Sequence, residues 1–146
     1  MPNFSNEDLC DELNDLIRLD YDAIEAYRAA IERLESGQCR RQLGEFLKDH
    51  ERHTNELGEE VRALGGVPDD GPGGMRMLTE GAVKMGALGN DRGILHAMNT
   101  NESVTNGSYE SAVDKLKGYP VQEVVARGLE DERRHKAWIE AELKKD

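Results

Sequence analysis

The chain has 146 residues, of which 37% are hydrophobic, and it carries 19 lysine and arginine residues against 30 aspartate and glutamate residues, a formal net charge of −11. This length suits a single domain over residues 1–146, and the composition is that of a folded protein rather than a disordered one. A chain this acidic repels nucleic acid and anionic membrane surfaces, so neither is an expected partner.

No stretch reaches the ~18 apolar residues of a membrane-spanning helix, and the start MPNFSNEDLC lacks the basic and apolar regions of a secretory signal. We therefore expect a cytoplasmic protein. Cys10 and Cys39 are expected near opposite ends of one long helix, about 40 Å apart at ~1.5 Å per residue, which is too far for a disulfide. Reduced cysteines are consistent with the cytosol.

The first half of the chain contains two runs in which apolar residues recur every three or four positions, as on the buried face of a helix. One run extends from Leu9 to Leu34, and Gly37 interrupts it. The other extends from Leu43 to Leu64 and ends at GGVPDDGPGG, where glycine and proline stop a helix. Two long helices are predicted there.

The second half repeats this pattern, with one run from Ile94 to Leu116 before KGYP and another from Val121 to Leu143. The connection over residues 65–91 is too long for a hairpin turn, so it is interpreted as a crossover; its segment MRMLTEGAVKMGAL is compatible with one short, glycine-weakened helix. The patterns together predict an all-α protein with four long helices, at residues 6–36, 38–65, 91–117 and 120–144.

A shift of 82 residues lays the first half of the chain over the second, which indicates two similar helical hairpins. Apolar matches, such as Leu13 with Leu95, arise by chance once one heptad of a helical chain is aligned. Polar matches are therefore the stronger evidence for duplication. The shift places Asp20 on Glu102, His50 on Glu132, and His53 on His135.

Ionisable residues interrupt the apolar face of every predicted helix: Asp20, His50, His53, Glu102, Glu132 and His135. They fall at one depth, because Asp20 lies 17 residues before Gly37 and His53 lies 16 after it, while the second hairpin repeats these offsets around Tyr119. Residues three apart share a helix face, so each hairpin offers one residue on its first helix and a pair on its second. Unpaired buried ionisable groups cost several kcal/mol, so these six need a common partner such as a metal cluster.

Two tyrosines lie two turns beyond these acids, Tyr27 after Asp20 and Tyr109 after Glu102. They are interpreted as aromatic core residues in preference to hydrogen-bond donors to the site. For the six ionisable residues, the alternative to a metal cluster is a hydrogen-bonded network in the core.

Several segments of the sequence resemble those of a known protein family. EDERRHKAWIEAEL resembles the last helix of the ferritin-like di-iron family, which includes bacterioferritin and rubrerythrin, and HTNELGEEVRALGGVP resembles the end of its second helix. RALGGVPDD, the crossover and NESVTNGSYESAV are similar to a family of small bacterial four-helix ferritin-like proteins. The resemblance covers residues 9–143 and implies a ferritin-like four-helix bundle with a long crossover between its second and third helices.

In that family two helices each supply a Glu and two others each supply Glu-x-x-His to a pair of metal ions. Four residues match these ligands by position: Glu132 and His135 of the last helix, Glu102 of the third and His53 of the second. Two residues depart from the pattern, because Asp20 replaces a Glu and His50 replaces the Glu that commonly bridges the two irons. Three carboxylates and three imidazoles thus stand in place of four and two, which removes one negative charge and a bridge.

The resemblance implies a dinuclear iron site, and mixed carboxylate and imidazole ligands also suit manganese or zinc. If the ions are redox-active, it implies a ferroxidase or a peroxidase-type enzyme that oxidises Fe(II) with oxygen or peroxide, in iron handling or oxidative-stress defence. The alternative is a non-catalytic structural or assembly bundle with a buried polar network or a structural zinc.

Two further expectations concern partners. The chain has no rubredoxin-like pairs of cysteines, so electrons would come from an external donor. It also ends just after the last predicted helix, without the extra helix of cage-forming ferritins. A small oligomer such as a homodimer is therefore expected rather than a shell.

Overall fold

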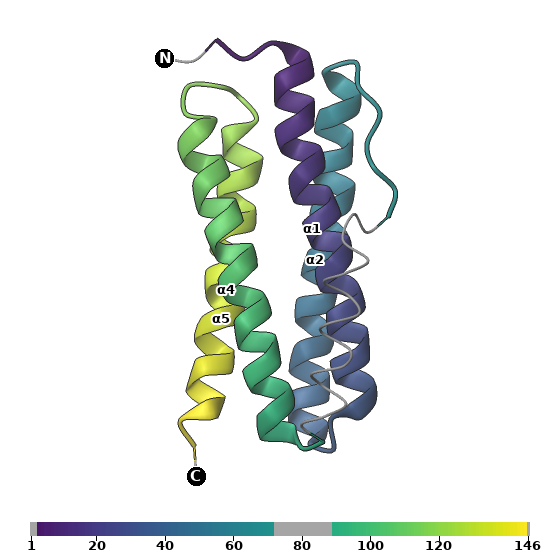
Figure 1. Ribbon diagram of the computed structural model, residues 1–146, viewed down its shortest axis with the longest axis vertical. Helices are drawn as coiled ribbons and strands as arrows, with labels where there is room; N and C mark the ends of the chain where they lie inside the picture. The colour runs from purple at the N-terminus through teal and green to yellow at the C-terminus, as the bar shows by residue number, and fades with distance from the viewer. Residues whose placement is uncertain (1–2, 72–88, 146) are drawn as a thin grey trace.

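The computed structural model describes residues 3–71 and 89–145, and every regular element in these ranges is an α-helix. Four long helices lie side by side (Figure 1). They are α1 (Asn6–Arg33), α2 (Gly37–Ala63), α4 (Asp91–Lys115) and α5 (Gln122–Leu143). All eight ends agree with the predicted ranges to within three residues, so the all-α prediction is confirmed.

Side chains at the N-termini explain where three of the helices begin. At α1, Ser5 accepts a hydrogen bond from the backbone of Asp8 while the Asp8 carboxylate accepts one from the backbone of Ser5. Ser36 caps α2 and Asn90 caps α4 in the simpler way, through one side-chain oxygen. Such caps each stabilise a helix by about 1 kcal/mol. Gly65, with φ of 88°, takes the left-handed conformation that ends α2.

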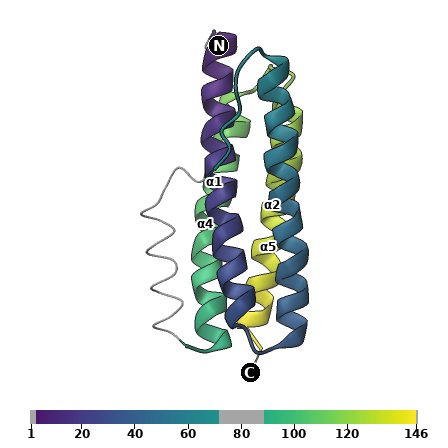
Figure 2. The same cartoon turned by 90° about the vertical axis from the view of Figure 1, so that its right-hand side faces the viewer.

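The helices form two antiparallel hairpins, α1 with α2 and α4 with α5, and each helix packs against two neighbours. The hairpins meet along α1 against α4 and along α2 against α5. Figures 1 and 2 show that α4 begins at the end of the bundle where α1 ends, opposite to the end of α2. The connection from α2 to α4 therefore joins opposite ends of the bundle, which confirms the predicted crossover.

The first residues of this crossover are held against α1. The side chain of Asn14 donates to the carbonyl oxygen of Val67 at 3.1 Å and accepts from the backbone of Asp69 at 2.8 Å. Arg18 forms an ion pair with Asp69 one turn further along α1. The short helix predicted within MRMLTEGAVKMGAL lies outside the described residues.

Two hydrophobic clusters fill the interior, one toward each end of the bundle. Leu13 and Val125 are fully buried in the cluster near the start of α1, and Leu43 and Ile139 are fully buried in the other. Each such side chain stabilises the fold by about 2 kcal/mol through burial alone. Between the two clusters, at the middle turns of the four helices, many of the buried side chains are polar or charged.

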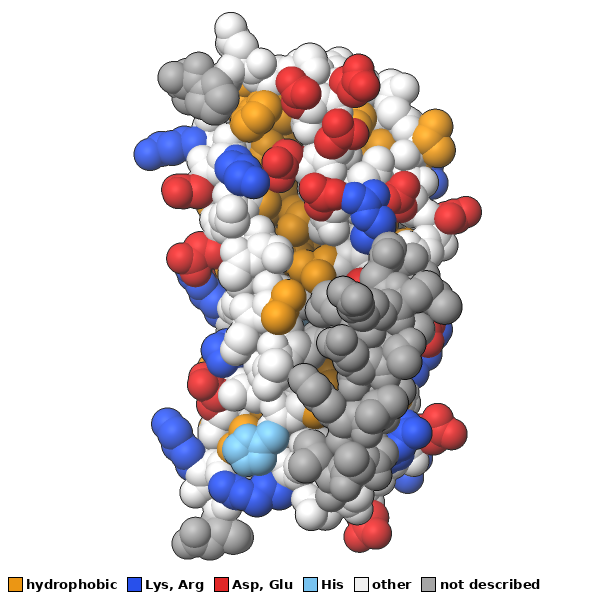
Figure 3. Space-filling model, in the orientation of Figure 1, with side chains coloured by type: hydrophobic (Ala, Val, Ile, Leu, Met, Phe, Trp, Pro, Cys, Tyr) orange, Lys and Arg blue, Asp and Glu red, His pale blue; other side chains and the backbone are white. Residues whose placement is uncertain are grey.

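Cys10 and Cys39 are both buried and both free, and they lie in different hydrophobic clusters. Along the described ranges, none of the helices combines the length and the apolar character that crossing a bilayer requires. On the face of the bundle seen in Figure 3, acidic and basic side chains are interspersed around a stripe of hydrophobic ones.

Candidate metal centre

The polar layer between the two hydrophobic clusters consists of the six ionisable residues that the sequence singled out. None of them is more than 4% exposed. Asp20 comes from α1, His50 and His53 from α2, Glu102 from α4, and Glu132 and His135 from α5. The three-residue spacing on α2 and on α5 turns both side chains of each pair toward the bundle axis. All six predicted residues are therefore brought together.

Their donor atoms form two overlapping groups, within each of which one atom per residue lies within 4.8 Å of the others. The first group is Asp20, His50, His53 and Glu132, and the second is His50, Glu102, Glu132 and His135. His50 and Glu132 belong to both groups. Two groups of mixed nitrogen and oxygen donors that share residues could hold a pair of first-row metal ions.

Asp20 is at the centre of the first group. His50 Nδ1 donates to Asp20 Oδ1 at 2.7 Å, and His53 Nδ1 donates to the same oxygen at 3.1 Å. Glu132 Oε1 lies 3.4 Å from His50 Nδ1 and 3.6 Å from His53 Nδ1. Four donor atoms from three helices thus surround one point.

Glu102 has the corresponding place in the second group. His135 Nδ1 donates to Glu102 Oε1 at 2.9 Å and lies 3.6 Å from Glu132 Oε2. The other ring nitrogen of His50, Nε2, lies 3.9 Å from Glu102 Oε1. The two oxygens of Glu132 therefore face different groups, and so do the two nitrogens of His50.

Two atoms of the cluster have no hydrogen-bond partner within the described residues although water does not reach them: His50 Nε2 and Glu132 Oε1. A buried polar atom without a partner costs about 1–3 kcal/mol and is uncommon in folded proteins. Both atoms belong to the two residues that the groups share, and both are donors of the kind that binds iron, manganese or zinc. The residues present therefore fit a pair of metal ions.

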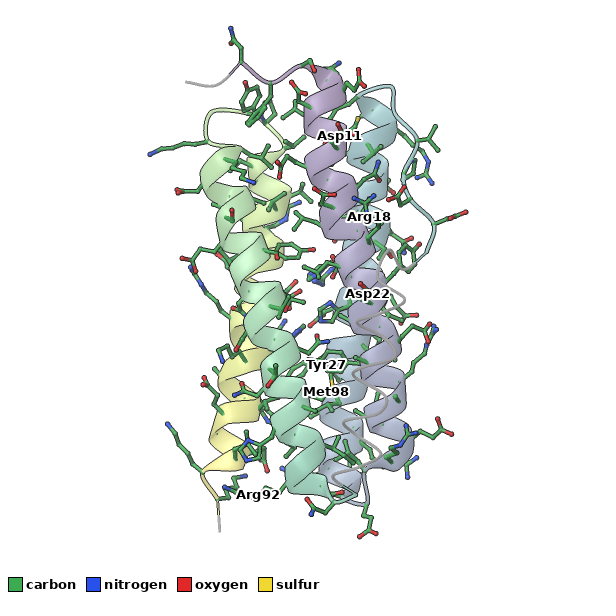
Figure 4. The ribbon with its side chains drawn as sticks, in the orientation of Figure 1. Asp11, Arg18, Asp22, Tyr27, Arg92 and Met98 are labelled. Carbon is green, nitrogen blue, oxygen red and sulfur yellow. The ribbon has the colours of Figure 1, made fainter. Side chains whose placement is uncertain are left out.

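Two tyrosines contact the cluster, each across the interface between the hairpins. Tyr27 on α1 donates to Glu102 Oε1 on α4 at 2.9 Å, and Tyr109 on α4 donates to Asp20 on α1. Tyr27 lies between α1 and α4, as does Met98 of the adjoining hydrophobic cluster (Figure 4). Both rings are buried in the core, as predicted. Their hydroxyls also donate hydrogen bonds to the site, which was the less favoured of the two interpretations. Their partners lie on the facing helix, where spacing along one helix gives no information.

Sequence reasoning missed two carboxylates at the outer edge of the cluster. Asp131 Oδ2 accepts from His53 Nε2 at 2.9 Å, and Asp49 Oδ2 accepts from His135 Nε2 at 2.8 Å. Each contact crosses from α2 to α5 and fixes the outer ring nitrogen, so that Nδ1 faces the cluster. The 82-residue shift also places Asp49 on Asp131, and this match was a signal that would have found them.

Two arginines cover these carboxylates from the solvent side. Arg134 donates to Asp49 at 2.9 Å and to Asp131 at 2.8 Å, while Arg52 pairs with Asp131. The 82-residue shift matches Arg52 with Arg134. The α2–α5 side of the cluster is thus closed by a charged layer of two acids and two bases.

Thr105 and Asn106 on α4 also contact the cluster, and no pattern in the sequence pointed to them. The Thr105 hydroxyl lies 3.0 Å from Glu102 Oε2 and 3.1 Å from Glu132 Oε2. Asn106 Nδ2 donates to the backbone carbonyl oxygens of Glu102 and Glu132 at 2.7 and 3.0 Å. Their equivalents under the 82-residue shift are apolar, so the internal repeat does not reveal them.

The surrounding acids hold the three imidazoles in their charged form when no ion is bound. Burial lowers the pKa of each histidine, but the neighbouring carboxylates outweigh this effect. The pKa of His53 rises to about 12 through Asp131, Asp20 and Glu132. The pKa of His135 rises to about 9 and that of His50 rises well above its usual value.

The carboxylates and phenols shift in the complementary directions. Burial raises the pKa of Asp20 and of Glu102, but the hydrogen bonds and positive charges of the neighbouring histidines prevail and hold the pKa of both below its usual range. Burial and the adjacent carboxylates raise the pKa of Tyr27 and of Tyr109, so both phenols stay protonated donors. Asp20 and Glu102 are thus ionised and able to bind a cation.

The cluster is separate from the open groove between α1 and α4. This groove has a volume of about 470 Å³, and its walls combine apolar residues such as Leu16 and Val104 with polar ones such as Ser103 and Ser108. Figure 3 shows hydrophobic side chains along this face of the bundle. None of the six cluster residues lines the groove, which is consistent with a dry centre.

Comparison with known proteins gives two findings. A family model described as "Domain of unknown function (DUF2383)" matches residues 8–115, which span α1, α2 and α4. Among solved structures, the chain is similar to one described as "Crystal structure of ferritin like, diiron-carboxylate proteins from Bacillus anthracis str. Ames". The two chains are 21% identical with a TM-score of 0.77, over 98% of this chain and 100% of that one. No curated protein matches the chain.

At this level of identity, the likeness to the solved structure establishes the fold. The four helices and their crossover form a ferritin-like four-helix bundle, as the sequence resemblance predicted. Within it, the chain places two candidate metal-binding groups in the core.

Proposed function

The chain belongs to the family described as Domain of unknown function (DUF2383), and from its ferritin-like fold and buried cluster we propose that it binds two metal ions, with iron as the resident metal. The ligands in this proposal are Asp20, His50, His53, Glu102, Glu132 and His135. The fold family favours iron over manganese and zinc, which accept the same donors. The solved relative is described as a diiron-carboxylate protein, and this supports the same choice.

One observation carries the proposal: the two candidate groups overlap in His50 and Glu132, and the atoms without hydrogen bonds belong to these two residues. A core network selected only for its hydrogen bonds would have satisfied its central atoms first, because an unsatisfied buried donor or acceptor costs stability. Ligand atoms, by contrast, must stay available for the ions. Donors are therefore left open at the two positions that serve both groups.

The remaining contacts suit a site that must hold ions in a fixed geometry. Asp49 and Asp131 orient the outer histidines, which commonly changes metal affinity by a factor of ~10–100. The hydroxyls of Tyr27 and Tyr109 donate to the carboxylates of Glu102 and Asp20 and restrict the rotation of these carboxylates. The hydrophobic clusters on either side exclude water. The net charge of −11 raises the local concentration of cations.

A pair of iron ions supplies redox chemistry, and the reaction we propose is oxidation of Fe(II) by oxygen or peroxide, in iron handling or oxidative-stress defence. The protein contributes neutral imidazoles and ionised carboxylates at fixed positions. It also contributes tyrosine hydroxyls that hold Asp20 and Glu102. Because the histidines are protonated before an ion binds, their protons leave as the site fills.

The test is metal analysis of protein purified without chelator or affinity tag. Two irons per chain are expected, together with a near-ultraviolet absorption band that develops when oxygen is added to the anaerobic Fe(II) protein. Substitution His135→Ala should lower the iron content, whereas His96→Ala, at an exposed histidine of α4, should leave it unchanged.

Zinc in place of iron, or no stoichiometric metal, would overturn this proposal and favour a non-catalytic structural bundle. That alternative has its own support, because most atoms of the cluster hydrogen-bond to one another without an ion, as Asp20 does to His50 and His53. A further outcome against iron oxidation is a wild-type protein that binds iron but shows no oxygen-dependent spectral change.

A further inference from the structure

We propose that His50 bridges the two ions, with Nδ1 bound to one ion and Nε2 bound to the other, where related sites use a carboxylate. The inference rests on the proposed function, because it concerns how two ions share the cluster. The ring would then be an imidazolate: two metal–nitrogen bonds form, and both protons of the charged ring present in the metal-free site are released to solvent. No oxidant or reductant is needed for this step.

The orientation of the His50 ring is the first argument. Its Nδ1 faces the first group, 2.7 Å from Asp20 Oδ1 and 3.4 Å from Glu132 Oε1. Its Nε2 faces the second group, 3.9 Å from Glu102 Oε1, and has no hydrogen bond within the described residues. A terminal ligand uses one ring nitrogen and gives the other a hydrogen-bond partner, as His53 and His135 do with Asp131 and Asp49. His50 is the cluster histidine whose second nitrogen lacks such a partner.

Glu132 is arranged in the same way, which is the second argument. Its Oε1 lies 3.6 Å from His53 Nδ1 in the first group, and its Oε2 lies 3.6 Å from His135 Nδ1 in the second. The two shared residues therefore each offer one donor atom to each side. The rigid ring of His50 would set the separation of the ions, and Glu132 would span it with one oxygen directed toward each ion.

The number of ligands gives a third argument. With His50 bridging, each ion receives two imidazole nitrogens and donors from two carboxylates, so the two positions are equivalent, as the internal repeat of the chain suggests. If His50 bound one ion only, that ion would keep four protein ligands and the other three. With this bridge the two positions stay equivalent although His50 replaces a carboxylate.

Charge is the fourth argument. Three carboxylates and three neutral imidazoles around two divalent ions leave one net positive charge in a site that is at most 4% exposed. An uncompensated charge in such a place is costly. Loss of the second ring proton from His50 makes the centre neutral. The imidazolate thereby supplies the negative charge that a bridging glutamate would otherwise supply.

The distance between the ions distinguishes a ring bridge from a carboxylate bridge. Two bonds of ~2.0 Å on opposite sides of an imidazole ring set the ions about 6 Å apart, whereas the ions of two-metal sites without such a ring between them lie ~3.5–4 Å apart. We would load the metal-free protein with two equivalents of Fe(II) under anaerobic conditions. The separation is then measured by X-ray absorption and by anomalous scattering from a crystal.

The wild-type protein is expected to hold two irons about 6 Å apart. His50→Glu should still bind two irons but shorten their separation to ~3.5–4 Å. The matched control is His53→Glu, one turn along the same helix, which should keep the longer separation because His50 remains. If a variant fails to fold, the wild-type separation alone still decides the question.

Two irons ~3.5–4 Å apart in the wild-type protein, or a His50 Nε2 that donates to Glu102 in the loaded crystal, would overturn the bridge. Either result would leave the proposed dinuclear function standing. Fewer than two irons per chain at saturation would instead overturn the proposed function, and the bridge with it. The measurement of content and the measurement of distance therefore separate the two failures.

Discussion

Asp49 and Asp131 hold the outer nitrogens of His135 and His53 from across the α2–α5 interface. Each contact joins an ionised carboxylate to a ring N–H, and a charge-assisted hydrogen bond of this kind is about twice as strong as a neutral one. The contact also decides which nitrogen faces the cluster. Control of the tautomer in this way makes the two aspartates part of the site although they contact no proposed ion position.

Substitution Asp131→Asn should therefore weaken metal binding by a factor of ~10–100, because the amide loses the charge that holds His53 Nε2–H. Competition with a coloured chelator measures the change. Glu130→Gln, at the exposed neighbouring position, removes the same charge and should alter affinity by much less. Equal losses in the two variants would mean that net charge alone is responsible and that the contact to His53 is unimportant.

In the protein from which metal has been removed, stability should fall as pH rises. Burial lowers the pKa of His135, but Asp49, Glu102 and Glu132 raise it to about 9 in the folded state, against ~6.5 in the unfolded chain. The stabilisation is therefore complete below about pH 6.5 and is lost as the pH passes through about 9. It amounts to on the order of 3 kcal/mol.

Urea unfolding of the metal-free protein at pH 6 and at pH 10 measures this difference. In His135→Gln, the part of the pH dependence that belongs to His135 should disappear. A wild-type protein that is equally stable at both pH values would show that the imidazole is not held in its charged form.

The four helices supply equivalent residues to the cluster, but they do not fill the space beside it equally. Phe46 on α2 stacks on the ring of His135 with centroids 4.2 Å apart. The position that matches Phe46 under the 82-residue shift is Gly128 on α5, and a Cβ there would lie 2.5 Å from Cε1 of Tyr109. The Tyr109 ring therefore fills the space beside the cluster on one side, and Phe46 fills the equivalent space on the other side. Helix α5 keeps a glycine so that the phenol of Tyr109 can reach Asp20.

Gly128→Ala should destabilise the protein by about 1–3 kcal/mol, because overpacking displaces Tyr109 and outweighs the gain in helix propensity. Gly44→Ala on α2 is the matched control. An added Cβ at Gly44 meets nothing within 4 Å, so this variant should be stabilised by up to about 1 kcal/mol. Chemical denaturation of both variants measures the difference, and two shifts of the same sign would contradict this account of Gly128.

The bundle as a whole consists of two hydrophobic clusters separated by the polar layer of six buried ionisable residues. This layer interrupts the apolar packing that stabilises a four-helix bundle, and it brings buried ionisable groups from all four helices together. Ions that bind the folded chain more tightly than the unfolded chain stabilise the whole molecule by mass action. Binding of the ions therefore stabilises both hydrophobic clusters together.

Metal removal should lower the free energy of unfolding by about 2.7 kcal/mol for each of the two ions, relative to protein at a free iron concentration one hundred times the dissociation constant of each site. Anaerobic thermal or denaturant unfolding with and without chelator measures the loss. His96→Ala should respond to chelator as the wild-type protein does, whereas His50→Ala should respond less. A wild-type protein whose stability does not change with chelator would mean that the polar layer is a hydrogen-bonded network alone.

Much of this architecture was predictable because it depends on spacing along the chain. Helices form through hydrogen bonds between residues four apart, so the period of the apolar residues predicted the four helices to within three residues at each end. The same spacing showed that the six ionisable residues share one depth and face inward. The length of the connection after α2 predicted the crossover, since the chain had to return before α4 could begin.

The contacts that cross between hairpins were not predictable in this way. Tyr27 finds its acceptor on Glu102, and His135 finds its acceptor on Asp49, in each case on a helix from the other half of the chain. Which helices become neighbours, and which side chains meet across each interface, depends on packing of the whole core. The period of the apolar residues gives the buried face of each helix but not the helix that this face contacts, so the pairing of each ligand with its partner became known only from the folded structure.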